Sequence, residues 1–95
     1  MLYTLLHSPW QCDFDSLLML LQKEDNLLLL QDGVIAALKN SQMLLKLIAS
    51  PANLWILEED IIARGLTNEI STKVNWLDYI GFVELTVKYQ PQIAW

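Results

Sequence analysis

The chain has 95 residues, of which 54% are hydrophobic, and its formal charge at neutral pH is −5. A chain of this length suits one domain with one core, and we expect residues 1–95 to form it. The 6 basic side chains are scattered singly among acids, whereas proteins that bind phosphate backbones cluster Lys and Arg. The composition therefore disfavours direct binding of nucleic acid.

Cys12 is the only cysteine, so the chain can form neither an internal disulfide nor a cysteine-based metal cluster. The first apolar stretch, residues 2–6, lacks the basic flank and the length of a secretory signal. No apolar run approaches the roughly 20 residues that span a bilayer. These features predict a cytoplasmic protein in a reducing compartment, without a membrane segment.

The first predicted elements are a strand over residues 2–6, which ends before Ser8 and Pro9, and a helix over residues 14–22. Asp13 is the expected N-cap of that helix. Apolar side chains then recur at helical spacing and predict one buried face, formed by Phe14, Leu17, Leu18 and Leu21.

The four consecutive leucines at 27–30 leave no polar face, which predicts a strand covered on both sides, as in a parallel sheet between helices. Asp32 is expected to cap a following helix over residues 34–38, with Gly33 allowing a tight turn. Binding sites collect at this carboxyl edge in open α/β sheets. A second helical stretch begins at Ser41, its predicted cap, and ends at Pro51.

The second half of the chain repeats this alternation. Strands are predicted over residues 53–57 and 73–77, with a short helix between them that starts at Glu58-Glu59-Asp60 and ends at Arg64-Gly65. Asp78 is expected to cap a last helix that ends before Pro91, and the tail 92–95 is either an edge strand or an interface peg. The side chains predicted to share one face of the last helix are Tyr79, Phe82, Val83 and Thr86.

Strand and helix thus alternate at least four times, which predicts a single α/β domain with a mostly parallel sheet, helices on both faces and right-handed crossovers. The apolar content is high for a domain of this size, so part of the apolar surface is expected to contact another chain.

No local motif indicates an enzyme, a cofactor or a metal site. Cys12 precedes a helix, where a thiol can ionise easily, but Asp13 and Asp15 oppose ionisation, so an inert thiol is favoured over a sulfur carrier. His7 is expected to be structural or to lie at an interface. The acidic run Glu58-Glu59-Asp60 is better explained by the helix dipole than by metal binding or acid/base chemistry.

The four tryptophans are too widely spaced to predict a stacking platform. Trp55 and Trp76 lie in predicted strands and are expected in the core. Trp10 lies next to a turn and Trp95 lies at the terminus, so these two are the candidate interface residues, because aromatic side chains are favoured in interfaces.

Four segments, in order and at matching spacing along the whole chain, make the sequence resemble the DsrH family of bacterial sulfur-relay subunits. They are residues 2–10 (LYTLLHSPW), 28–34 (LLLQDGV), 59–66 (EDIIARGL) and 82–95, which begins FVELTVK and ends in Ala94-Trp95. The resemblance implies a DsrE/DsrF/DsrH-like α/β fold.

The resemblance also implies a cytoplasmic heterohexamer with TusC-like and TusD-like subunits, two copies of each of three chains. Such a complex passes persulfide sulfur from a TusA-like donor to a TusE-like acceptor, for 2-thiolation of the wobble uridine in certain tRNAs. The sulfur-carrying cysteine belongs to the TusD-like subunit, and no catalytic role is carried over to Cys12.

We therefore expect a noncatalytic subunit that supplies interface area to the partners that carry the sulfur. Two alternatives stay open at this point. One is a sulfurtransferase subunit with a persulfide on Cys12, and the other is a stand-alone homo-oligomeric binding module.

Overall fold

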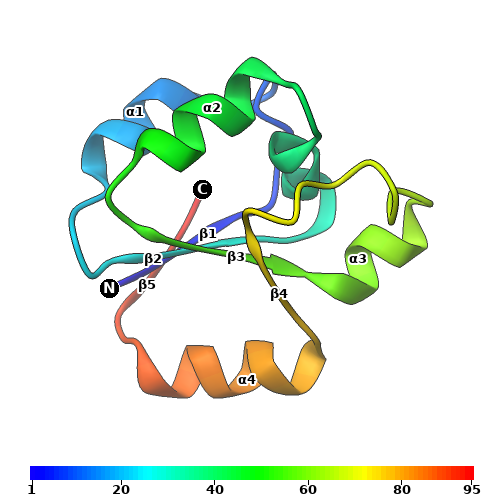
Figure 1. The fold of residues 1–95 in the computed structure, drawn as a ribbon. Coiled ribbons are helices and arrows are strands. Elements are labelled where there is room, and N and C mark those ends of the chain that lie inside the picture. Colours follow the sequence, from blue (N-terminus) through cyan, green and yellow to red (C-terminus); the bar gives the residue numbers. More distant parts are fainter.

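A computed structural model describes residues 1–95, and its centre is a five-stranded sheet in which every neighbouring pair of strands is parallel (Figure 1). The strand order is β4-β3-β2-β1-β5. The strands are β1 (Leu2–Leu5), β2 (Asn26–Leu29), β3 (Asn53–Leu57), β4 (Asn75–Leu77) and β5 (Gln92–Ala94). The predicted α/β class with a parallel sheet is confirmed.

The leucine run forms the central strand, as predicted. Leu27 and Leu29 are completely buried in a large cluster on one face of the sheet, and Leu28 and Leu30 are buried in a smaller cluster on the other. Because side chains alternate along a strand, only a sheet covered on both sides can bury all four.

One face of the sheet, called the upper face here, carries α1 (Phe14–Leu20), the 3₁₀ helix η1 (Gln31–Ala37) and α2 (Gln42–Ala49) (Figure 1). Both predicted caps are confirmed: Asp13 accepts a hydrogen bond from the backbone N–H of Ser16, and Ser41 accepts one from that of Leu44. The predicted face of α1 is also confirmed, since Phe14, Leu17 and Leu21 are buried and Leu18 packs against them.

The helix predicted over residues 34–38 is wrong in type and start. The structure has the 3₁₀ helix η1, and Asp32 lies inside its first turn, while the N-cap is Leu30 without a side-chain hydrogen bond. Gly33 is needed for a close approach rather than for a turn, because a Cβ at this position would collide with the backbone oxygen of Leu5. Only a residue without a side chain lets the chain pass so close to β1.

The opposite, lower face carries one helix, α4 (Tyr79–Lys88), which is capped by Asp78 as predicted (Figure 1). Its predicted face is wrong, because Tyr79 and Val83 are exposed. The residues that meet the sheet are Phe82, Leu85 and Tyr89, which pack in the smaller cluster. The pattern was ambiguous because both sides of this helix are apolar.

The remaining elements are α3 (Glu58–Ala63) and the two edge strands of the sheet, β4 and β5. α3 follows β3, and Gly65 adopts a positive φ of 65° just after the helix. The strand predicted over 73–77 begins only at Asn75. The tail forms the edge strand β5, one of the two possibilities left open. None of the helices is both long and apolar enough to cross a membrane.

Candidate functional site

Cys12 lies in the turn before α1 and is half-buried. It lines an open pocket of about 250 Å³ together with Trp10 from the same turn and with Met43 and Lys46 from α2. The fold therefore joins the two candidate residues Trp10 and Cys12 in one place.

The surroundings of Cys12 disfavour the thiolate. Burial raises the pKa of the Cys12 thiol, and the negative charge of Asp13 raises it further. Lys46 is the one cation in this pocket, and its Nζ lies 3.0 Å from Oδ1 of Asp15, so an existing ion pair already uses it. Sequence reasoning missed Lys46, since nothing in the local pattern indicates that α1 and α2 lie side by side.

Trp10 and Trp95 differ in how the fold holds them. The side chain of Trp10 is 70% exposed, which suits a contact residue. Trp95 is half-buried: its indole N–H donates to the backbone oxygen of Asp13 at 3.1 Å, and its backbone N–H donates to Thr4 O at 2.7 Å. The C-terminal residue is therefore built into the chain's own fold.

The carboxyl ends of β1 and β5 mark the point where the strand order reverses, which is where open α/β sheets commonly bind ligands. In this chain Trp95 lies at that point. Leu6 N donates to Trp95 O at 3.2 Å, and Nδ1 of His7 lies 3.3 Å from the same oxygen. This contact is consistent with a structural role for His7, one of the two roles expected from the sequence.

The acidic run at the start of α3 ties neighbouring segments together. Asp60 accepts a hydrogen bond of 2.6 Å from the backbone N–H of Gln31, and Glu59 accepts one of 3.0 Å from that of Tyr79. Arg64 bridges Asp60 and Asp32, with N–O distances of 3.7 and 3.1 Å. These carboxylates thus join the segments that follow β2, β3 and β4.

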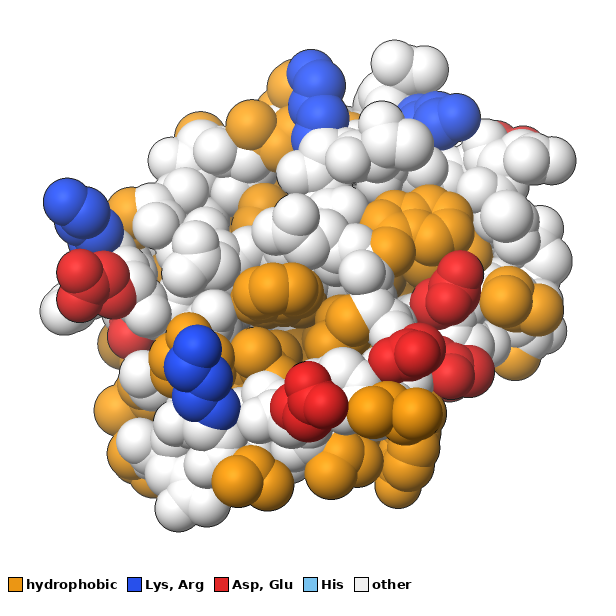
Figure 2. Space-filling model, turned by 60° about the horizontal axis from the view of Figure 1, so that its bottom comes forward, with side chains coloured by type: hydrophobic (Ala, Val, Ile, Leu, Met, Phe, Trp, Pro, Cys, Tyr) orange, Lys and Arg blue, Asp and Glu red, His pale blue; other side chains and the backbone are white.

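Exposed apolar side chains gather on the outer surface of α4 (Figure 2). Ile80, Val83 and Val87 follow helical spacing and are 67%, 42% and 71% exposed. Between α4 and the sheet lies a hollow of about 220 Å³ lined by Trp55 and Leu77 among others. A hydrophobic surface of this kind on a helix that already packs through its other side is typical of a contact with a second chain.

Trp55 and Trp76 are half-buried rather than fully in the core. The indole N–H of Trp55 donates to Oδ1 of Asn26 at 3.0 Å, and that of Trp76 donates to Ser71 O at 3.2 Å. Both rings pack against the buried clusters, so the prediction of a core role is correct in position and overstated in burial.

Comparison with known proteins adds two findings. A family model described as "DsrH like protein" matches residues 7–92. The "Protein TusB" of Yersinia pestis (strain Pestoides F) is 54% identical to this chain over 95 residues, which is 100% of both proteins. The "Protein TusB" of Yersinia pseudotuberculosis serotype O:1b (strain IP 31758) is similar to the same extent.

Proposed function

This chain belongs to the DsrH family, and from that premise we propose that it is the noncatalytic subunit of a TusBCD-type sulfur relay. The relay passes persulfide sulfur toward 2-thiolation of the tRNA wobble uridine. The observation that carries this proposal is the 54% identity to TusB proteins over the full length of both chains.

The noncatalytic role is supported by the state of Cys12. A persulfide carrier attacks as a thiolate, and here burial and Asp13 both raise the pKa of the thiol. The nearby cation Lys46 is paired with Asp15 and gives the thiolate little help. The resemblance to the family implies that the sulfur-carrying cysteine belongs to the TusD-like partner.

The contribution of this chain is contact surface. TusC-like and TusD-like subunits bury the apolar outer side of α4 in a cytoplasmic heterohexamer, and the exposed Trp10 is a further contact residue. Trp95, which the chain's own fold already holds, contributes only the part of its ring that stays exposed. The TusA-like donor and the TusE-like acceptor exchange sulfur through the assembled complex. The net charge of −5 disfavours direct contact between this chain and tRNA, so any contact with tRNA is made by another protein of the relay.

The test replaces the native gene by variants in a cell and measures 2-thiouridine in tRNA hydrolysates by mass spectrometry. Cys12→Ser should restore thiolation to nearly the wild-type level, because the hydroxyl keeps the shape of the site without the thiol. Val83→Asp with Val87→Asp should lower thiolation by weakening the complex roughly tenfold, as expected for contact residues in an interface.

Gln22→Asp with Lys23→Asp, at two exposed positions in the loop after α1, introduces the same side chains away from α4; it is the matched control and should assemble and thiolate normally. Loss of thiolation in Cys12→Ser with an intact complex, together with a sulfur adduct on Cys12 that passes to an acceptor, would instead establish the chain as a persulfide carrier. A native mass that shows only copies of this chain would favour a stand-alone homo-oligomer.

A further inference from the structure

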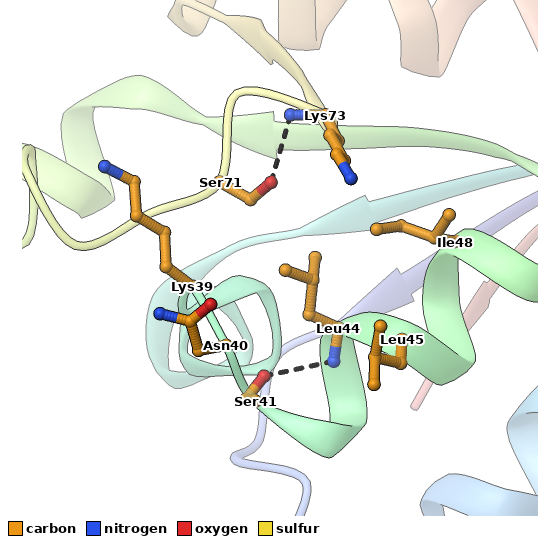
Figure 3. A pocket seen from close by; sticks show the side chains of 8 residues that line it. All are labelled: Lys39, Asn40, Ser41, Leu44, Leu45, Ile48, Ser71 and Lys73. Carbon is orange, nitrogen blue, oxygen red and sulfur yellow. Dashed lines mark hydrogen bonds between the residues drawn. The ribbon is translucent and has the colours of Figure 1, made fainter.

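A second concave surface lies on the upper face, between α2 and the loop that precedes β4 (Figure 3). Its volume is about 440 Å³. Leu44 and Ile48 extend into it from α2, and Ser71 and Lys73 face them from the loop. Lys39 lies at the far end of the pocket. The nearby hydroxyls are engaged within the chain, since Ser41 accepts from Leu44 N and Ser71 accepts from Lys73 N.

The charge of this pocket is opposite to that of the chain. Two of the 6 basic side chains, Lys39 and Lys73, line it, and no acidic residue does, although the chain carries 11 acids. The ion pairs of the structure involve the N-terminus, Lys46 and Arg64, so both pocket lysines lack a carboxylate partner. Lys39 donates only to a backbone oxygen, that of Asn68, at 3.0 Å.

The side of the pocket that α2 forms is apolar, and much of that apolar surface is exposed. Ile48 is 40% exposed and Leu45 is 67% exposed. Leu45 lines the pocket too and is nevertheless mostly exposed, so a small anion beside the lysines would leave most of its side chain in water. A protein segment that crosses α2 would cover Leu45 and fill the pocket together.

We propose that this pocket receives a segment of a companion subunit in which an Asp or Glu is followed or preceded by an apolar side chain. The carboxylate enters between Lys39 and Lys73, which stand at opposite ends of the pocket, and it is attracted by both charges. The apolar side chain packs on Leu44 and Ile48. The inference rests on the proposed function, because it needs a complex with companion subunits. Charge complementarity of this kind sets the partner and its orientation more than the total affinity.

The first experiment compares the free chain with the complex purified from co-expression with its TusC-like and TusD-like partners. Both samples are treated briefly with acetic anhydride, and lysine acetylation is measured by peptide mass spectrometry. Lys39 and Lys73 should lose most of their acetylation in the complex. Lys23, an exposed lysine in the loop after α1, is the internal control and should react equally in both samples.

The second experiment measures affinity. Lys39→Gln with Lys73→Gln should weaken assembly about tenfold at low salt, the size expected for two partly exposed ion pairs, and the difference should shrink at high salt. Lys23→Gln is the matched control and should assemble normally. Carbodiimide, which joins amines to carboxylates in contact, should link Lys39 or Lys73 to an Asp or Glu of a companion subunit beside an apolar residue.

Equal acetylation of Lys39 and Lys73 in a complex that does form overturns the docking site and leaves the proposed function standing. A carbodiimide link to a second copy of this chain also overturns it. If no complex forms with the relay proteins, the proposed function and the docking site fail together.

Discussion

The two faces of the sheet are covered to very different extents. On the upper face, α1, η1 and α2 pack over a cluster of 17 buried residues, whereas on the lower face α4 alone packs over a cluster of 5. The thick layer supplies most of the buried apolar surface and hence most of the stability. The thin layer keeps apolar side chains at its surface, where another chain can bury them.

Handedness explains this asymmetry. The chain moves steadily across the sheet from β1 to β4, and right-handed crossovers in one direction place every connection on the same face. The step from β4 to β5 runs back across the whole sheet, so the same handedness places α4 on the other face. Because only one connection runs in this direction, only one helix covers the lower face.

The largest expected effect contrasts the two clusters directly. Leu29→Ala, in the upper cluster, should lower the free energy of unfolding by about 4 kcal/mol, because its completely buried site cannot collapse. Leu85→Ala, under α4, should cost about 2 kcal/mol, since the thinner layer can relax around the cavity. Urea unfolding of the isolated chain measures both. Equal losses would contradict the contrast between the faces.

The next effect compares a glycine on each face. Gly33→Ala should destabilise the chain by about 3 kcal/mol, because the added carbon meets the backbone of β1, which cannot move aside. At Gly81, in α4, the nearest atom is a side-chain carbon of Leu77 at 3.2 Å. The better helix propensity of alanine offsets this contact, so Gly81→Ala should change stability by less than about 1 kcal/mol. Thermal unfolding of both variants measures the two changes in stability. An unchanged stability in Gly33→Ala would contradict the close approach of Gly33 to β1.

The smallest effect concerns the cap of α1 on the thick layer. The side-chain and backbone hydrogen bonds from Ser16 lower the pKa of Asp13 from its ordinary value of 3.8. A lowered pKa in the folded chain stabilises it above the ordinary value, and this stabilisation is lost as the pH falls through the folded-state pKa. The urea midpoint of the wild type should therefore drop relative to Asp13→Ser, an uncharged cap, below pH 3.8. A constant difference between the two proteins would contradict it.

How far sequence patterns succeed depends on the range of the interactions behind them. The caps Asp13, Ser41 and Asp78 were predictable because each bonds an N–H within three residues. The buried side of α4 was not, because both sides are apolar and only the position of the helix on the sheet distinguishes them. The role of Gly33 depends on a strand about 28 residues earlier in the chain, which a local turn rule ignores.

The candidate site shows the same division. Cys12, its acidic neighbours and the exposed Trp10 could be identified from the sequence. The sequence could not show that Lys46 lies near Cys12, or that Lys39 and Lys73 line one pocket. The two residues of each pair are 34 positions apart in the chain, and only packing on the upper face brings them together.

The sequence by itself determined the alternation of strands and helices, the double burial of the leucine run, the acidity and the family resemblance, since these depend on residue types and short spacings. Only the tertiary structure decided which helix faces meet the sheet and which lysines remain without partners. It also decided that Trp95 lies at the carboxyl ends of β1 and β5, where the strand order reverses. Those features arise from contacts between segments distant in the chain, and the handed path across the sheet chooses which segments meet.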